Sequence, residues 1–172
     1  MKGIDFKKDI ILNLYDRQLL LQKFADYKNY IILIILGFIS WKIVKLFSEI
    51  NELLQNSHIS IVLNVFIVIL LFMLIVSFFI SFVYTMKSIF PNINGESNTP
   101  IFWGNVKNYE LDSIVDFFMK NNEEILIKEL IKEYKINSEI TLFKFKNNKL
   151  GMIFMLISVI LFLVINFILA IK

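Results

Sequence analysis

Three long stretches of apolar residues, separated by polar and charged stretches, dominate the pattern along the chain. The last and cleanest lies between Lys149 and Lys172 and contains no charged residue. At 1.5 Å of rise per residue, its roughly 22 residues are long enough to cross a hydrocarbon core of about 30 Å. The pattern therefore predicts a transmembrane helix over residues 150–171.

Two earlier apolar stretches predict two further spans. The first covers residues 30–48 and is free of charge until Trp41. The second covers residues 60–86 and is long enough to cross a bilayer with some tilt. Its main polar interruptions are Asn64, Ser77 and Ser81. A short and mostly polar stretch, residues 49–59, lies between the two spans and predicts a turn outside the membrane.

Charged residues at helical spacing interrupt the far end of the first predicted span. Lys42, Lys45, Glu49 and Glu52 follow one another at three, four and three residues, which places them on one helix face. Lys45 and Glu49 have the i, i+4 spacing of an ion pair. In one interpretation the helix leaves the bilayer here and Lys42 extends outward to water. In the other, the stripe faces a neighbouring subunit or an aqueous path, because ionisable residues inside membranes usually face polar surroundings.

Composition extends this interpretation to the whole chain. The 172 residues are 57% hydrophobic, with a mean hydropathy of +0.67, above the roughly 45–50% apolar content of soluble domains. Many Phe with few Gly and Pro favour helices over a membrane barrel. We predict an all-α integral membrane protein with three transmembrane helices and a small, mainly helical cytosolic segment between spans two and three.

The stretch before the first span, residues 1–29, predicts an amphipathic lead-in helix of mixed charge. We expect its apolar side to pack on the cytosolic part of the protein, because a helix that binds lipid by itself needs a more basic polar face. That apolar side is formed by Phe6, Ile10, Leu14, Leu21 and Phe24.

Residues 87–149 carry nine lysines and nine acidic residues, and predict a cytosolic sensor or coupling segment. After a loop with both prolines, Asn105 or Asn108 is expected to cap a helix that ends near Met119. Asn121 or Asn122 is expected to cap a second helix, which has no Gly or Pro before Gly151 and can therefore continue into the third span. Its expected core positions are Ile127, Leu130, Ile131 and Tyr134.

The distribution of Lys and Arg predicts the orientation. Six precede the first span, none lie in residues 49–59, and nine lie between spans two and three. The amino terminus and residues 87–149 are therefore expected in the cytoplasm. In this orientation Asn64 and Asn166 lie at similar depth, where they can hydrogen-bond between helices or between subunits.

Candidate chemistry is sparse. The chain lacks cysteine, and its one histidine, His58, has no neighbouring ligands, so we expect no metal site. The acidic residues Glu110, Asp112 and Asp116 fit the solvated face of a helix, so we expect no enzyme. Trp103, beside Gly104, is the best platform on which a planar base could stack. It equally fits an anchor at the membrane interface.

Several short motifs resemble one known family. ADYKN at 25–29, SIFPN at 88–92, IFWGNV at 101–106 and EYKINSEITLFKFK at 133–146 resemble the pattern of the Pycsar membrane effectors: ADxKA, then Pro, then FFGdI, then QIyxlSxI with Lys six residues after the Ser. The residues that fit in order are Asp26, Lys28, Pro91, Gly104, Ser138, Ile140 and Lys144. The chain departs from the pattern at several positions, among them Asn29, Trp103, Asn105 and Val106.

The resemblance implies an effector of antiphage defence in the bacterial inner membrane. Such an effector senses a cyclic pyrimidine mononucleotide, cyclic CMP or cyclic UMP, made by a functionally linked nucleotide cyclase, and disrupts the membrane in abortive infection. No cofactor is expected, and three spans enclose no pore alone, so we expect a ligand-controlled homo-oligomer in the lipid bilayer. The alternative is a non-catalytic membrane anchor or accessory subunit of a larger complex.

The candidate site residues fall into two groups. Those expected to bind the ligand or couple it to the spans are Trp103, Gly104, Asn105, Tyr109, Asp26, Lys28, Ser138 and Lys144. Those expected to line a pore or to bond between helices are Lys42, Lys45, Asn64 and Asn166.

Overall fold

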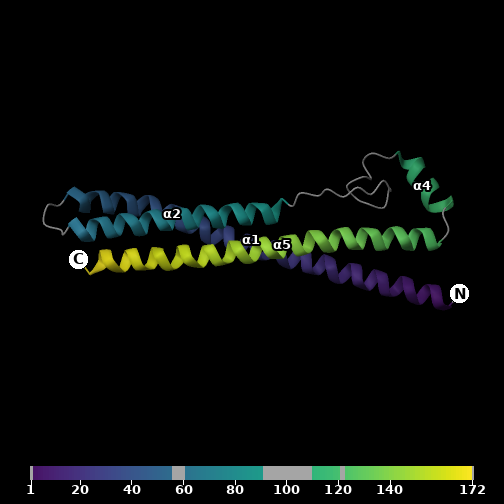
Figure 1. Cartoon of the computed structure of the whole chain (residues 1–172). Helices are drawn as coiled ribbons and strands as arrows, with labels where there is room; N and C mark the ends of the chain where they lie inside the picture. The colour runs from purple at the N-terminus through teal and green to yellow at the C-terminus, as the bar shows by residue number, and fades with distance from the viewer. Residues whose placement is uncertain (1, 56–60, 91–109, 121–122, 172) are drawn as a thin grey trace. The chain divides into compact units, whose positions relative to one another are not determined.

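The computed structural model describes residues 2–55, 61–90, 110–120 and 123–171. All regular structure in these residues is helical, in four helices (Figure 1). They are α1 (Lys2–Gln55), α2 (Ile61–Ile89), α4 (Leu111–Lys120) and α5 (Glu123–Ala170). Of the helices described, α1, α2 and α5 are each long and apolar enough to cross a membrane. The prediction of an all-helical chain with three such helices is confirmed.

Two helices are longer than the predicted spans. α1 joins the lead-in stretch to the first apolar stretch and continues to Gln55, so residues 49–55, expected as a turn, are helical. No proline precedes Pro91, which leaves nothing to stop the helix after the apolar stretch. α5 is continuous from Glu123 to Ala170, as expected from the absence of proline along it.

The short helix α4 runs from Leu111 to Lys120. The Ile114 amide donates to the Glu110 carbonyl at 3.1 Å. The predicted caps of this helix, Asn105 and Asn108, lie outside the described residues. Asp112 in its first turn and Lys120 in its last turn both suit the helix dipole. The expected caps of α5, Asn121 and Asn122, lie outside the described residues.

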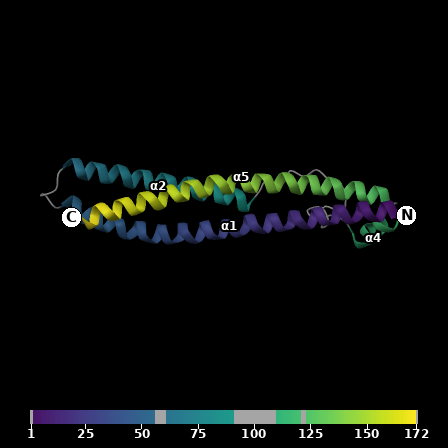
Figure 2. The same cartoon turned by 90° about the horizontal axis from the view of Figure 1, so that it is seen from below.

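The chain divides into two compact units. The first, called here the polar unit, contains residues 1–24 and 91–143; the second, the membrane unit, contains residues 25–90 and 144–172. In the membrane unit, α2 runs alongside the carboxyl-terminal part of α5 (Figures 1 and 2). Aliphatic side chains of all three helices form its main core, which consists of Leu46, Ile50, Ile67, Leu71, Leu74 and Ile165.

Small hydroxyl residues also bring α2 against α5, between Ser77 and Thr85. Ser77 and Ser158 share a hydrogen bond of 2.8 Å, and the Ser81 hydroxyl donates to the Gly151 carbonyl at 2.8 Å. A Cβ atom on Gly151 would lie 3.0 Å from the Thr85 Oγ1 atom. The two backbones therefore approach closely here, as small residues permit in membrane helices.

The polar unit packs partly through a face that the sequence pattern did not predict. On α5 the expected core residues Ile127, Leu130 and Tyr134 are half-buried. Of the expected apolar side of α1, Ile10, Leu14, Leu21 and Phe24 are all exposed. Gln18 is buried instead, in line with half-buried Tyr15 and Gln22. On α5 the buried residues are Glu129, Glu133, Asn137 and Thr141, whereas Ile131, an expected core residue, is half exposed. Two hydrogen bonds cross between the helices on this face, from Tyr15 to Glu133 and from Gln22 to the Asn137 carbonyl.

Candidate functional site

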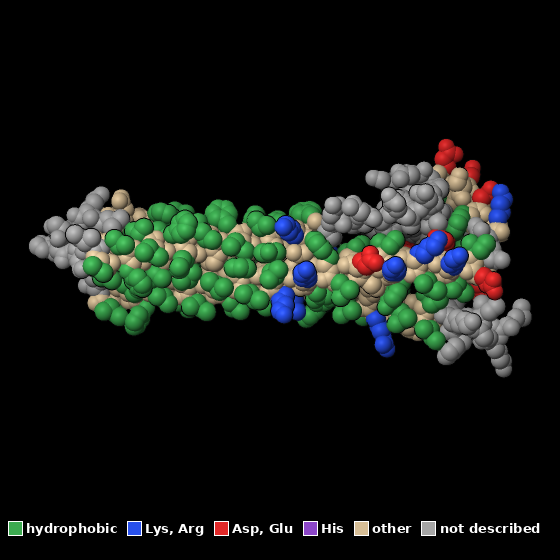
Figure 3. Space-filling view, viewed as in Figure 1, with side chains coloured by type: hydrophobic (Ala, Val, Ile, Leu, Met, Phe, Trp, Pro, Cys, Tyr) green, Lys and Arg blue, Asp and Glu red, His purple; other side chains and the backbone are tan. Residues whose placement is uncertain are grey.

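The hydrophobic surface of the membrane unit ends at a group of basic side chains (Figure 3). By sequence, Lys87 follows the apolar stretch of α2, Lys146 and Lys149 precede that of α5, and all three are exposed. Long basic side chains at this place mark the level at which helices leave the hydrocarbon for the headgroup region. Among these exposed lysines lies a buried polar cluster that joins all three helices.

An ion pair between α1 and α5 is the centre of this cluster. The Lys144 ammonium donates to the Asp26 carboxylate at 2.8 Å. The Lys144 side chain is only 12% exposed, whereas that of Asp26 is 40% exposed. The buried Lys144 ammonium loses most of its hydration, and the Asp26 carboxylate compensates for this loss.

Hydrogen bonds extend the cluster to α2. The Asn29 side-chain amide donates to the Ser88 hydroxyl at 3.0 Å, and that hydroxyl donates to the Lys144 carbonyl at 3.1 Å. Asn148 returns from α5 to α1, because its amide donates to the Ala25 carbonyl at 2.8 Å. These five residues, called here the junction cluster, are Asp26, Asn29, Ser88, Lys144 and Asn148.

The hydrogen bonds also determine the orientation of both asparagine amides. The Ala25 carbonyl can only accept a hydrogen bond, so the side-chain nitrogen of Asn148 faces it. The Ser88 hydroxyl donates its hydrogen to the Lys144 carbonyl and can only accept from Asn29, so the side-chain nitrogen of Asn29 faces Ser88. The Oδ1 atoms of Asn29 and Asn148 are thus buried, and neither bonds to a described protein group. A buried acceptor without a partner is costly, so water is the expected partner of these oxygens.

A cavity of about 180 Å³ borders the junction cluster. Residues from all three helices line it: Asp26, Asn29, Tyr30, Ile89 and Lys144. Ligand pockets usually measure about 300–1,000 Å³, so the space suits a few water molecules rather than a nucleotide. The junction cluster is therefore a connection between helices and not a closed nucleotide pocket.

The structure describes four of the eight predicted ligand or coupling residues, and it brings two of them into direct contact. Asp26 and Lys144 form the ion pair, and the Lys28 ammonium lies 5.7 Å from the centre of the Phe145 ring. Ser138 lies on α5 in the polar unit and is half-buried. Four predicted ligand residues lie outside the described residues: Trp103, Gly104, Asn105 and Tyr109.

The predicted pore and inter-helix residues all lie in the membrane unit. Lys45 and Glu49 form the expected pair, at 3.7 Å. The Lys42 ammonium lies over two rings of its own helix, 5.0 Å from that of Trp41 and 5.6 Å from that of Phe38. Asn64 is half-buried. The Asn166 amide donates to the Phe162 carbonyl one turn before it, at 2.7 Å.

A second buried polar row lies in the polar unit, between α1 and α5. The Tyr15 hydroxyl donates to the Glu133 carboxylate at 3.3 Å, and the Gln22 amide donates to the Asn137 carbonyl at 3.4 Å. Burial raises the pKa of Glu133, although the Tyr15 hydrogen bond opposes this effect. Burial and the nearby Glu133 charge raise the pKa of Tyr15. This row therefore includes an acid that is easier to protonate than an exposed glutamate.

The sequence interpretation missed three residues of the junction cluster. Asn29 counted there only as a departure from the alanine of the family pattern, yet its side chain connects α1 to Ser88. Ser88 and Asn148 follow and precede apolar stretches, where they resemble ordinary polar boundary residues. Only their spacing from Asp26 and Lys144 along the helices could have identified them. No group of three potential metal ligands occurs among the described residues.

Comparison with known families gives one match, over nearly the whole chain. The family model described as PycTM, the Pycsar effector protein domain, matches residues 10–171. No curated protein and no solved structure matches the chain.

Proposed function

Because the chain belongs to the Pycsar effector family, and is thus a membrane effector of antiphage defence, we propose that it senses a cyclic pyrimidine mononucleotide and then disrupts the membrane. The ligand is cyclic CMP or cyclic UMP, supplied by a linked nucleotide cyclase. The disrupting species is a homo-oligomer in the bacterial inner membrane, with the amino terminus in the cytoplasm.

The junction cluster is the observation that carries this proposal. Lys144 bonds to both other helices of the membrane unit. Its ammonium donates to Asp26 on α1, and its carbonyl accepts from Ser88 on α2. Lys144 also lies within α5, which is unbroken from Glu123 to Ala170. A small rotation or shift of α5 at this point therefore changes the contacts of all three helices.

A ligand can drive such a shift only if it binds one arrangement more tightly than the other. A change from 1:99 to 99:1 requires a preference of about 5.5 kcal/mol. The contacts of Lys144 with Asp26 and Ser88 are among those whose free energy the ligand must change. The ligand itself is proposed to bind in the segment that contains Trp103, Gly104, Asn105 and Tyr109.

Dye release from liposomes tests the proposal. The purified chain is reconstituted, and cyclic CMP, cyclic UMP or cyclic AMP is added. Release with a cyclic pyrimidine nucleotide, and little with cyclic AMP, is the expected result. Absence of release with every nucleotide, together with capture of a stoichiometric membrane partner from cells, would replace the proposal with the role of an anchor or accessory subunit.

A further inference from the structure

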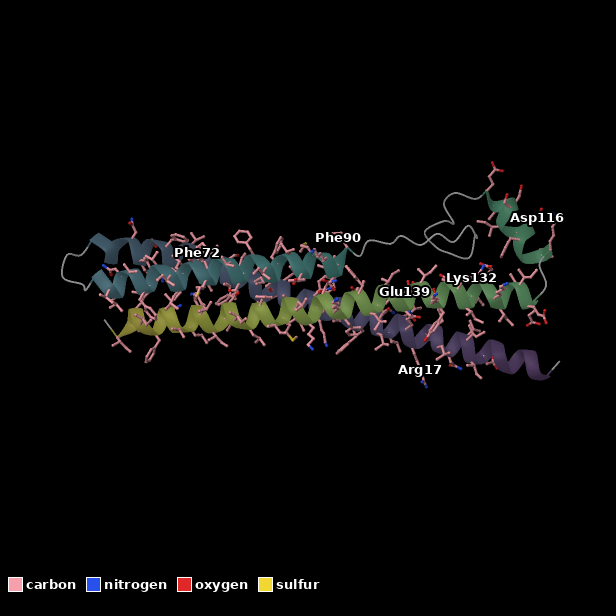
Figure 4. All side chains as sticks on the ribbon, viewed as in Figure 1. Arg17, Phe72, Phe90, Asp116, Lys132 and Glu139 are labelled. Atoms are coloured by element: carbon pink, nitrogen blue, oxygen red, sulfur yellow. The ribbon has the colours of Figure 1, made fainter. Side chains whose placement is uncertain are left out.

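The charged stripe of α1 consists of Lys42, Lys45, Glu49 and Glu52, and the structure describes the side chains of the first three. These three lie at the level of apolar parts of the other two helices, because Leu46, next to Lys45, belongs to one core cluster with Ile67, Leu71 and Leu74 of α2 and Ile165 of α5. Phe72, labelled in Figure 4, is in the middle of this part of α2. The stripe is therefore at the level of α2 residues well inside the apolar stretch, and not at the level of its end.

The distance along α1 from Lys28 leads to the same depth. The Lys28 ammonium lies 5.7 Å from the centre of the ring of Phe145, which directly precedes Lys146 of the basic group. Lys42 follows Lys28 by fourteen residues, or about 21 Å of helix, and Lys45 follows it by about 26 Å. Both lie within a hydrocarbon core of about 30 Å that begins at Lys28, with Glu49 at its far edge.

The direction of the Lys42 side chain argues against the interpretation that it extends outward to water. Its ammonium lies over the ring of Phe38, one turn nearer the amino terminus. Side chains on a helix lean toward the amino terminus, so Lys42 points toward the middle of the span. Its contacts with Phe38 and Trp41 give only part of the stabilisation that water would give to an ammonium.

One chain offers the stripe little further compensation. Lys45 and Glu49 pair with each other, yet their side chains remain 70% and 43% exposed. Between Val62 and Met86 on α2, and between Leu150 and Ile171 on α5, the sequence contains no charged residue. Charged side chains that face lipid at this depth cost about 2.5–3.5 kcal/mol each on insertion scales. Among the described residues, neither of the other two helices offers this surface a charged partner at this depth.

We propose that the stripe is covered by the same stripe of a second copy of this chain. Copies in one membrane share an orientation, so their stripes meet at the same depth. Lys45 of each copy can then pair with Glu49 of the other copy. The charges become buried between subunits instead of facing lipid. The inference deepens the proposed homo-oligomer and rests on it.

Cysteine cross-linking tests this interface, because the chain contains no cysteine of its own. Ser48→Cys places a thiol beside the stripe, where the native hydroxyl bonds only to the Lys45 carbonyl of its own helix. Met73→Cys, on the exposed side of α2, is the matched control. Oxidation in native membranes, without nucleotide and again with cyclic CMP or cyclic UMP, should link Ser48→Cys at least five-fold more than Met73→Cys.

Charge exchange between chains distinguishes an interface from a pair within one chain. Adding Lys45→Glu or Glu49→Lys to the Ser48→Cys chain should each reduce the cross-link, and co-expression of the two variants should restore it. Lys45→Gln and Glu49→Gln give the same loss if the reversals fail to insert. Equal linking at Ser48→Cys and Met73→Cys in both conditions, or no loss with the charge variants, would overturn the interface. Loss of dye release with the cross-link intact would instead count against nucleotide sensing.

Discussion

The Asp26–Lys144 ion pair should contribute measurably more to stability than an ordinary surface pair. With Asp26→Asn and Lys144→Met in a double-mutant cycle, we expect a coupling free energy of about 1–2 kcal/mol. Exposed pairs give roughly 0.2–1 kcal/mol, and breaking a fully buried pair costs about 3–5 kcal/mol. An intermediate value follows because Lys144 is 12% exposed and Asp26 is 40% exposed. Neither change removes the bond from Ser88 to the Lys144 backbone carbonyl.

The assay is the free energy of unfolding from denaturant titration of the purified chain in detergent. The matched control is the Asp116–Lys120 pair on α4, whose side chains are 59% and 72% exposed. The same cycle there should give a coupling no larger than about 0.5 kcal/mol. If the Asp26–Lys144 coupling does not exceed that of the control, the junction cluster is not a connection between helices of the kind described.

Three further variants test other contacts. Gly151→Leu should lower the free energy of unfolding by about 2–3 kcal/mol, because the larger side chain forces α2 and α5 apart. Gly37→Leu is the control and should have little effect, because no atom lies within 4 Å of a Cβ added there. Equal melting temperatures of the two variants would contradict the close approach of α2 and α5. Because burial raises the pKa of Glu133, the contribution of this residue to stability is full below pH 4.5 and is lost as the pH rises through the raised pKa. Glu133→Gln should therefore reduce the dependence of the melting temperature on pH between pH 4.5 and neutrality. The same pH dependence in the variant and in the unchanged chain would contradict this. Asn29→Ala should lower the free energy of unfolding by about 0.5–1.5 kcal/mol through loss of the bond to Ser88, and no loss would remove Asn29 from the cluster.

The apolar pattern predicted the membrane helices well because length and lack of charge are sufficient to identify them. The absence of proline likewise predicted that α5 continues without a break. Helix faces in the polar unit were harder to predict. Ile10 and Leu14 are exposed, whereas the buried face of α1 includes contacts such as the bond from Tyr15 to Glu133, formed by residues 118 positions apart, which local periodicity does not reveal.

The junction cluster was only partly predictable for the same reason. Asp26 and Lys144 were singled out by their place in a family pattern, but periodicity gives no sign that two residues so distant in sequence form an ion pair. Asn29 and Asn148 depend on the register of α1 against α5, which is a property of the folded membrane unit. The ligand segment around Trp103 lies outside the described residues and stays a prediction.

The central claim is that a cyclic pyrimidine nucleotide causes this chain to disrupt the membrane. The most direct test is the membrane potential of energised inside-out vesicles that contain the chain and expose its cytoplasmic side to added nucleotide. We expect collapse of the potential with cyclic CMP or cyclic UMP, little change with cyclic AMP, and no collapse in vesicles without the chain. A potential that persists with all three nucleotides, in vesicles shown to contain the inserted chain, would contradict the account.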